Sequence, residues 1–352
     1  MNTSQKIPVA VLGATGSVGQ KFIELLSNHP WFEISELAAS ERSAGKKYRD
    51  AVNWIQSSPL PAHIGDMIVR ECKPDLKSRI AFSGLDASVA GEIESELALK
   101  GYYVISNSRN HRFDPDVPLL IPEINPDHLE LVKTQKYDGA IVTNPNCSTI
   151  GLVMALKPLL DNFGLDAVNV VTMQALSGAG YPGVSSLDII DNVVPFIGGE
   201  EKKMETEPLK ILGTLSGNSV INCDFRISAQ CNRVAVIDGH TEAVQVKLKK
   251  KASAAEIISA WKSFRSLPQR LQLPSAPENP LYYFEEEKYP QPKLHRNIDK
   301  SMAVSIGRLR ECPLFDYKFV LLSHNTVRGA AGGALLNAEL MLKTGYFSGL
   351  SV

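Results

Sequence analysis

The chain has 352 residues, enough for about two domains of roughly 150 residues each, with a sizeable core that needs no disulfides or metals. Its 37 lysines and arginines nearly balance 38 aspartates and glutamates, so the net charge of -1 creates no basic field for nucleic acid or an anionic membrane. Hydrophobic residues make up 44% of the chain and charged residues 21%, as in globular proteins. The composition therefore argues against a disordered, fibrous or nucleic-acid-binding protein.

The five cysteines form no CxxC pair, so the sequence predicts neither a disulfide framework nor a metal site. They are Cys72, Cys147, Cys223, Cys231 and Cys312. The N-terminus is polar, and no apolar run reaches the ~20 residues of a membrane span. We expect a cytoplasmic protein with neither an export signal nor a membrane anchor.

The first part of the chain alternates apolar strands with amphipathic helices. Strands are expected at 7–13, 32–39, 80–82 and 102–106, and helices at 17–27 and 89–100. Because this β-α alternation is typical of parallel sheets with crossover helices, it predicts an α/β fold with a Rossmann-type, doubly wound parallel sheet.

The pattern changes near Asn144, where we place a domain boundary. A strand at 141–143 leads through an Asn-Pro-Asn turn into an apolar helix at 149–160. Further strands are expected at 168–173, 233–237, 243–248 and 319–322, and a last helix at 328–342. Their β-branched and alternating patterns predict an α+β domain with a mixed or antiparallel sheet and helices on one side. Residues 274–292 lack periodicity and are expected to form a long ordered loop or a crossing between subunits.

A glycine-rich loop lies between the first expected strand and the first expected helix. It reads Gly13-Ala-Thr-Gly16-Ser-Val-Gly19, and glycines there permit a tight turn and a close approach to a pyrophosphate. The positive helix end and its free N–H groups favour the same charge. Such a pattern alone can be a plain turn, but its flanks favour a dinucleotide site. Its candidate contacts are Gly13, Thr15, Gly16, Ser17 and Val18.

The end of the second expected strand bears on the choice between NAD and NADP. In NAD-binding folds a carboxylate there binds the ribose 2′-hydroxyl, but this strand ends in Ser40-Glu41-Arg42-Ser43. Arg42 between two serines could hold a 2′-phosphate, whereas Glu41 would repel it unless it points away. We favour NADP over NAD. The alternative is that Arg42 and the basic pair Lys46-Lys47 form only a solvated surface turn.

Cys147 follows the turn Asn144-Pro-Asn146, where the chain enters a helix. The helix N-terminus stabilises a thiolate, and its N–H groups can hold an oxyanion, as a nucleophile attacking an acyl group requires. A cysteine taken alone is more often a buried apolar residue. We assign that role to the other four cysteines and predict that Cys147 is catalytic.

The segment Asp238-Gly-His240-Thr-Glu242 interrupts a β region and should place His240 at a loop or bulge. Arg233 lies seven residues earlier, and in a regular strand this odd separation would send the two side chains to opposite faces. We expect the glycine to bend the chain so that both face one site. His240 could then exchange protons beside Cys147. The alternative is a hydrogen-bonded structural histidine.

These motifs form an ordered series along nearly the whole chain. The segments are GATGSVGQ at 13–20, SNSRNHRFDPDVPLLIPEIN at 106–125, TNPNCST at 143–149, QALSGAGYPG at 174–183, GGEEKKMETEPLKI at 198–211, DGHTE at 238–242 and HNTVRGAAGG at 324–333. Together they resemble the aspartate-semialdehyde dehydrogenase family, in the subgroup found in archaea and fungi. The resemblance implies reduction of L-aspartyl-4-phosphate to L-aspartate-4-semialdehyde with NADP, through a cysteine thioester, in lysine, threonine and methionine biosynthesis.

The resemblance also implies roles for single residues. Cys147 would be the nucleophile and His240 the acid/base, while the Asn146 side chain would help to hold the oxyanion. Gln174 would orient the acyl substrate, and Arg233 would pair with its α-carboxylate through a bidentate fork.

Further contacts to substrate and cofactor follow from the same resemblance. Arg112 and Lys203 would hold phosphate, with help from Asn110. Glu200 would bind the substrate's amino group, although Glu201 and Lys202 leave the register of this segment open. The cofactor contacts would be Ser40, Arg42 and Ser43 for the 2′-phosphate, Asn325 for the nicotinamide carboxamide, and Ser83 and Gly178 beside the cofactor.

The implied organisation has three parts: an NADP-binding domain over 1–143, a catalytic and dimerisation domain over 144–323, and a C-terminal helix over 324–352 that returns to the first domain. A homodimer or homotetramer is expected. Malonyl-CoA reductase is an alternative because it shares HNTVRGAAGG, but the second asparagine of NPNC and the segment GGEEKK favour the aspartyl substrate. N-acetylglutamyl-phosphate reductase is a more distant alternative. A non-catalytic NADP-binding regulator is disfavoured because Cys147, Arg233 and His240 are all present.

Overall fold

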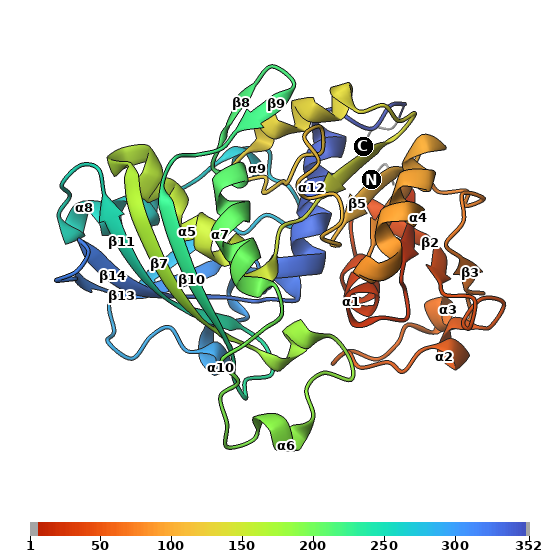
Figure 1. Ribbon diagram of the computed structural model, residues 1–352. Coiled ribbons are helices and arrows are strands. Elements are labelled where there is room, and N and C mark those ends of the chain that lie inside the picture. The colour runs from red at the N-terminus through yellow and green to blue at the C-terminus, as the bar shows by residue number, and fades with distance from the viewer. Residues whose placement is uncertain (1–5, 350–352) are drawn as a thin grey trace.

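The computed structural model describes residues 6–349, which form two six-stranded sheets and a two-stranded hairpin. Figure 1 shows the sheet from the N-terminal part on the right and the sheet from the later part on the left, with helix α12 between them. None of the helices described is long and apolar enough to cross a bilayer.

The first sheet is entirely parallel, with the strand order β3-β2-β1-β4-β5-β6. Its strands are β1 (Ile7–Leu12), β2 (Phe32–Ala39), β3 (Arg70–Glu71), β4 (Ile80–Ser83), β5 (Tyr103–Ser106) and β6 (Ala140–Thr143), and its main helices are α1 (Ser17–Leu26) and α4 (Ala87–Leu99). The predicted doubly wound parallel sheet is confirmed. Leu12 pairs with Ala38 and with Ser83, so the strands end together and their loops meet at one edge.

The second sheet is mixed, with the order β10-β7-β11-β14-β13-β12. Its strands are β7 (Leu165–Gln174), β10 (Arg226–Arg233), β11 (His240–Leu248), β12 (Leu281–Phe284), β13 (Val304–Glu311) and β14 (Tyr317–Ser323). Two pairs, β10 with β7 and β12 with β13, are parallel, and the others are antiparallel. The predicted mixed sheet is confirmed.

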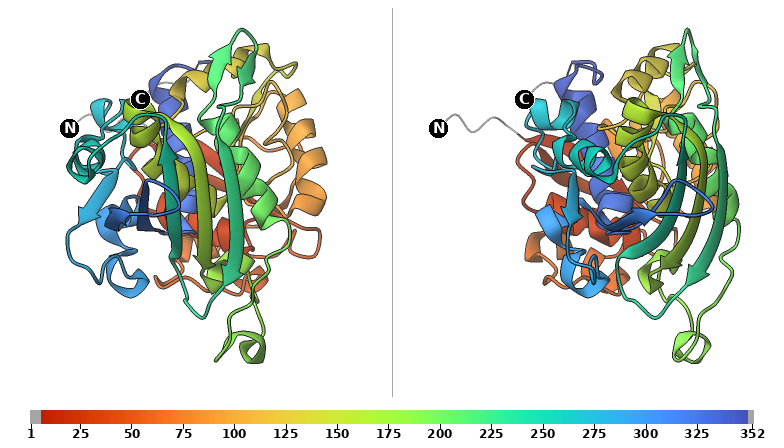
Figure 2. Two further views of the ribbon diagram at one scale, coloured as in Figure 1. Left: turned by 60° about the vertical axis from the view of Figure 1, so that its left-hand side comes forward. Right: turned by 90° about the vertical axis from the view of Figure 1, so that its left-hand side faces the viewer.

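Helices pack against one face of this second sheet. They are α5 (Cys147–Phe163), α7 (Glu200–Ile211) and α8 (Ala254–Ser263). In the left view of Figure 2 no helix lies in front of β10, β7 and β11. The hairpin β8 (Thr214–Ser216) and β9 (Ser219–Ile221) projects beyond the sheet (Figure 1).

Short helical segments connect these elements. They are α2 (Tyr48–Ala51), α3 (Ala62–Gly65), η1 (Pro126–Thr134), η2 (Leu176–Ala179), α6 (Ser186–Ile189), α9 (Leu267–Arg270), α10 (Pro292–His295) and α11 (Ile298–Ser301). The expected loop at 274–292 is partly wrong because it contains β12.

The strand predicted at 233–237 is wrong. Strand β10 ends at Arg233, and residues 234–239 cross the end of β7, because β10 and β11 both neighbour β7. The apolar residues of this crossing form bends and bond to the segment after β7: Val236 and Ile237 accept from the N–H groups of Leu176 and Ser177. His240 is the first residue of β11 rather than part of a loop or bulge.

The C-terminal segment packs against the first sheet. A π-helical turn, Val327–Ala331 (η3), precedes α12 (Gly332–Lys343), so the helix expected at 328–342 begins with an irregular turn. Leu336 and Leu340 of α12 are fully buried in the same core cluster as Val9 of β1. Arg328 donates from both Nη atoms to the Glu123 carboxylate at 2.8 Å. This buried pair fixes the point at which the chain returns.

Candidate active site

A cleft of about 730 Å³ joins the glycine-rich loop to Cys147. Its walls include Ser17, Val18, Asn107, Arg109, Arg112, Asn146, Cys147, Ser177, Gly178, Lys203, Asn325 and Gly329. These residues come from loops and helices beside both sheets and from the returning C-terminal segment. The cleft therefore brings the predicted cofactor loop, nucleophile and anion-binding residues together.

Cys147 is the first residue of α5, and Asn146 caps this helix. The Asn146 Oδ1 atom accepts from the N–H groups of Ser148 at 3.0 Å and Thr149 at 3.3 Å. Its Nδ2 atom donates to Glu200 Oε1 at 2.7 Å. A side chain at Gly329 would meet Cys147, since an added Cβ would lie 2.8 Å from the Cys147 Cβ. The cap and the close packing hold the Cys147 side chain in place.

His240 lies next to this thiol. The His240 Nε2 atom is 3.2 Å from Cys147 Sγ, and Nδ1 accepts from the Ala175 N–H at 3.0 Å. In a neutral imidazole one nitrogen accepts and the other carries the proton. The Ala175 contact therefore assigns the proton to Nε2, which donates toward the sulfur.

The surroundings of the thiol and the imidazole favour the neutral form of both groups. Burial, and secondarily the charge of Glu200, raises the pKa of Cys147 to about 12. Burial also lowers the pKa of His240 to about 3, although Glu200 opposes that shift. Desolvation therefore works against the thiolate that the helix N-terminus would stabilise.

Three polar side chains lie in a row across the ends of β10, β7 and β11. Arg233 pairs with Gln174 in the sheet, and His240 begins the strand on the other side of β7. Arg233 and His240 therefore meet because their strands lie on either side of β7. The expected bend at Gly239 is not what brings them together. Arg233 Nη1 donates to the Ala175 carbonyl at 2.6 Å. An added Cβ on Gly178 would lie 2.9 Å from this Nη1, so the glycine allows the loop to cover the row.

Helix α7 contributes the acidic and basic residues of the motif at 198–211, and its register is resolved. Glu200 and Lys203 face the site and contact each other at 2.8 Å, whereas Glu201 accepts from the Cys231 N–H and Lys202 is exposed. Burial alone would raise the pKa of Glu200, but Lys203 and the Asn146 amide outweigh it and hold the pKa below its usual value. A carboxylate charge is thus maintained beside Cys147.

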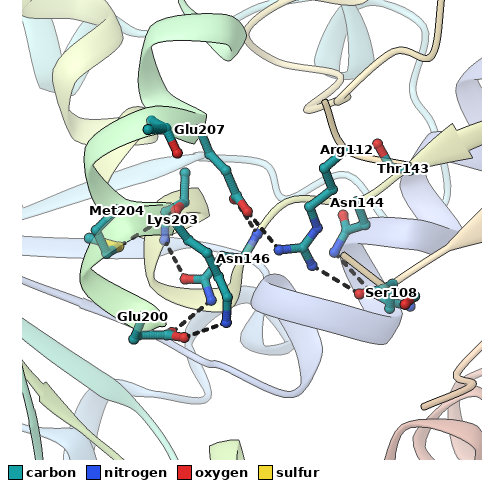
Figure 3. Close-up of polar contacts among 12 residues, drawn as sticks. Ser108, Arg112, Thr143, Asn144, Asn146, Glu200, Lys203, Met204 and Glu207 are labelled. Carbon is teal, nitrogen blue, oxygen red and sulfur yellow. Dashed lines mark hydrogen bonds and ion pairs between the residues drawn. The ribbon is translucent and has the colours of Figure 1, made fainter. Parts of the chain in front are cut away.

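Arg112 and Lys203 lie on the cleft as the sequence predicts, but Asn110 does not. Arg112 is 6% exposed and is held by Glu207 and by the Asn107 carbonyl (Figure 3). Asn110 accepts from the Ser108 hydroxyl and donates to the Ala87 carbonyl. Its amide is thus used to fix the loop, and Arg109 faces the cleft in its neighbourhood.

The glycine-rich loop has the geometry that a pyrophosphate needs. Gly13 has φ of +68°, and an added Cβ would lie 2.7 Å from the Gly84 carbonyl oxygen, so only glycine fits there. Gly16 is the N-cap residue of α1 and makes no side-chain hydrogen bond to the helix. The first N–H groups of the helix are therefore available to an anion. Ser17 and Val18 line the cleft. Thr15 accepts from the Gln20 side chain through its carbonyl.

The expected cofactor contacts outside the loop differ in exposure. Ser40 and Arg42 are exposed in the turn after β2, and Ser43 is half-buried. Ser83 is fully buried and donates to Glu94 Oε1 at 2.6 Å, so its hydroxyl does not line the cleft. Asn325 lines the cleft, where its amide accepts from the Gly239 N–H and donates to the Ser177 hydroxyl.

Sequence reasoning missed three residues of this site. Ser177 orients the Asn325 amide, Gly329 packs on Cys147, and Glu207 bonds to Arg112 and to the backbone of Asn146. All three lie inside the quoted motifs, but no pattern in those motifs distinguishes them from their neighbours. For Glu207, the helical spacing of seven residues from Glu200 was an available signal.

The chain matches two family models. Residues 8–132 match the semialdehyde dehydrogenase NAD binding domain, and residues 156–328 match the semialdehyde dehydrogenase dimerisation domain. Together the two matches span most of both sheets.

Relatives and solved structures agree with these matches. The aspartate-semialdehyde dehydrogenase of Methanothermobacter thermautotrophicus is 51% identical over 343 residues, 95% of this chain and 99% of that one. The enzyme of that name from Saccharomyces cerevisiae is 48% identical over 94% of this chain and 96% of that one. A crystal structure of the Candida albicans aspartate-semialdehyde dehydrogenase with NADP superimposes with a TM-score of 0.91, at 44% identity, and covers 97% of this chain and 99% of that one. The chain therefore belongs to the aspartate-semialdehyde dehydrogenase family.

Proposed function

We propose that this chain reduces L-aspartyl-4-phosphate to L-aspartate-4-semialdehyde and phosphate with NADPH, through a thioester on Cys147. The observation that carries the proposal is the contact of 3.2 Å between Cys147 Sγ and His240 Nε2 at one end of the cleft. The same cleft contains the cationic side chains of Arg112 and Lys203 and the start of α1. An anion-binding site beside an acylable thiol fits an acyl phosphate.

The substrate is bound by groups of both signs. Arg233 pairs with the α-carboxylate, and Glu200, whose charge is maintained, binds the α-amino group. Gln174 lies between them and donates to Glu200 Oε1 at 3.3 Å, so it orients the acyl chain. Arg112 and Lys203 hold the phosphoryl group by charge-assisted hydrogen bonds. Asn110 contributes to phosphate binding indirectly, because it fixes the loop that carries Arg112.

Acylation begins when Cys147 Sγ attacks the acyl carbon. The departing phosphate takes up the thiol proton, and His240 Nε2–H donates to the sulfur as its negative charge develops. The oxyanion is held by the Cys147 N–H at the start of α5 and by the second N–H of Asn146 Nδ2, whose first N–H bonds to Glu200. Phosphate leaves toward Arg112 and Lys203, and a thioester remains.

When bound, NADPH supplies a hydride to the thioester carbon. The glycine-rich loop and the start of α1 bind the pyrophosphate, Ser40, Arg42 and Ser43 bind the 2′-phosphate, and Asn325 and Gly178 lie at the nicotinamide end. As the C–S bond then breaks, His240 Nε2–H donates a hydrogen bond to the departing thiolate, which takes up a proton from solvent. The acid half of the expected role of His240 needs an imidazolium, which carries a proton on Nδ1 as well as on Nε2, so Nδ1 must release the Ala175 N–H. The base half has the same requirement, because an Nε2 that accepts a proton belongs to the Nδ1–H tautomer.

We also propose the organisation of the chain. Residues 1–143 form the NADP-binding domain, 144–323 the catalytic and dimerisation domain, and 324–352 the returning segment, which is supported by the packing of α12 in the first core. The match to a dimerisation domain supports a homodimer or a homotetramer built from it. We place the enzyme in the cytoplasm, where the five free thiols of the structure stay reduced.

The test is the reverse reaction in solution. L-aspartate-4-semialdehyde, inorganic phosphate and either NADP or NAD are mixed with the protein, and reduced nicotinamide is followed by absorbance. Phosphate-dependent formation of NADPH supports the proposal. Oxidation of NADPH with malonyl-CoA, and no signal with the semialdehyde, would replace the proposed substrate while keeping the thioester. Silence in both assays would refute the catalytic function.

A further inference from the structure

Helix α7 carries a stripe of mostly polar residues on its inner face. The members are Glu200, Lys203, Met204, Glu207 and Lys210, spaced so that they fall on one side of a helix. Figure 3 shows the first four pointing toward the nucleophile turn and Arg112. An inward helix face is normally apolar. This stripe therefore serves specific contacts as well as core packing.

Glu207 uses both carboxylate oxygens in this stripe, and it is fully buried. Its Oε1 atom accepts from Arg112 Nη1 at 2.7 Å, and its Oε2 atom accepts from the Asn146 N–H at 2.7 Å (Figure 3). One carboxylate thus bridges the loop after β5 and the turn that precedes Cys147. Among the described residues of α7, Glu207 is the one with hydrogen bonds to both segments, which also meet directly where Asn144 Nδ2 donates to Asn107 Oδ1.

The Arg112 side chain is fixed from two directions. Glu207 holds Nη1, and the Asn107 carbonyl accepts from Nη2 at 2.9 Å. Nε is buried without a hydrogen-bond partner among residues 6–349. One turn further along α7, Lys210 Nζ donates to the carbonyls of Arg112, Asp114 and Val117. The backbone and the guanidinium of this segment are therefore both anchored to α7.

We propose that Glu207 is a positioning residue that sets the phosphate-binding guanidinium of Arg112 in register with the nucleophile Cys147. The proposal rests on the function proposed above, in which Arg112 receives phosphate and Cys147 carries the acyl group. A phosphate oxygen must approach the acyl carbon along a defined line, and a displacement of about 1 Å can cost on the order of a hundredfold in rate. Because the Glu207 carboxylate lowers the net positive charge at Arg112, it does not strengthen the attraction of phosphate. Its contribution is to orient the guanidinium.

The variant Glu207→Gln separates the two contacts of this carboxylate. The amide oxygen can still accept from the Asn146 N–H, but the amide NH₂ then faces Arg112 Nη1, donor against donor. The protein is given the semialdehyde and NADP without phosphate, and the rapid formation of one NADPH per chain reports acylation of Cys147. Phosphate is then added, and steady-state turnover reports its attack on the thioester.

We expect Glu207→Gln to keep the phosphate-free burst while kcat/KM for phosphate falls about 10- to 100-fold. Glu207→Ala loses both contacts and should slow the burst as well. Glu205→Gln is the matched control, because Glu205 lies on the same helix and, within residues 6–349, accepts only from the Ala229 N–H, away from the cleft. It should match the wild type. The midpoint of thermal unfolding and the Kd for NADP are measured for each variant.

A merely electrostatic or structural role gives different results. If Glu207→Gln binds phosphate more tightly and keeps kcat, the carboxylate only offsets the charge of Arg112 and the proposal is wrong. An equal loss in burst and phosphate steps, together with a lower midpoint of unfolding, would also contradict it. If the variant does not fold, Arg112→Lys supplies the test: it keeps the charge and loses the fork, and unchanged phosphate kinetics would overturn the proposal. A wild type without phosphate-dependent turnover would refute the proposed function instead.

Discussion

The floor of the cleft and the turn after β2 are built in opposite ways. On the floor, Gln174, Glu200 and His240 are at most 5% exposed, and each contacts another group of the site. In the turn, Ser40 and Arg42 are exposed to water, and Arg42 forms no ion pair among the described residues. Buried polar networks transmit a change to every member, whereas exposed groups act singly. We therefore expect large, coupled effects on the floor and small, specific effects at the turn.

The largest effect is expected at the nucleophile. Cys147→Ala removes the atom that carries the acyl group, so turnover should fall by a factor of about 10⁴ or more. The glycine-rich loop is a separate part of the cleft, and the Kd for NADP should change less than about twofold. Steady-state kinetics and fluorescence titration give the two values. Cys312→Ala is the control for loss of a thiol, because Cys312 lies outside the cleft. Retained turnover in Cys147→Ala would remove Cys147 from the mechanism.

The second effect tests the buried, neutral thiol by its pH dependence. Burial raises the pKa of Cys147 to about 12, so the thiolate fraction, and with it the rate of alkylation by iodoacetamide, should rise about tenfold per pH unit between about pH 7 and pH 10. The alkylated peptide is quantified by mass spectrometry. A rate that levels off near neutral pH would show a stabilised thiolate and contradict the neutral pair.

The third effect tests the carboxylate-binding arginine on the floor. Arg233→Leu removes a buried charge-assisted contact, and kcat/KM for the semialdehyde should fall about 100-fold. Arg226→Leu is the matched control, because Arg226 begins the same strand and its side chain is 77% exposed. If both variants kept wild-type kinetics, Arg233 would be only a structural partner of the Ala175 carbonyl.

The smallest effect is expected at the exposed turn. Arg42→Asp replaces the proposed 2′-phosphate partner by a like charge, and the ratio of kcat/KM for NADP to that for NAD should fall about tenfold or more. Lys46→Asp serves as the comparison, since Lys46 is exposed in the same basic segment. Equal shifts in the two variants would mean that the segment acts only through its overall charge.

The contrast between the two regions also explains what the sequence could predict. The first sheet follows from local patterns: β1 is buried almost throughout, as a central parallel strand requires, and 32–39 is predicted to the residue. The cysteine at the start of α5 and the glycine-rich loop follow from residues that are close in sequence. Each of these features depends on the conformation of one short segment.

Other features depend on which strands become neighbours, and local patterns do not contain that information. His240 and Arg233 meet because β10 and β11 flank β7. The apolar residues after Arg233 have the composition of a strand, but they cross the end of β7 without joining the sheet. Asn110 and Ser83 have suitable side chains, but tertiary contacts with Ala87 and Glu94 occupy them. The high pKa of Cys147 likewise comes from burial by distant segments, which the helix start alone does not reveal.

The most direct test of the account is a single-turnover measurement without phosphate. The protein is mixed with L-aspartate-4-semialdehyde and excess NADP, NADPH is recorded, and the quenched protein is digested and analysed by mass spectrometry. The account predicts a burst of one NADPH per chain and one aspartyl group on the peptide that contains Cys147. A burst without an adduct at Cys147, or an adduct at another cysteine, would contradict the thioester at the centre of the proposed function.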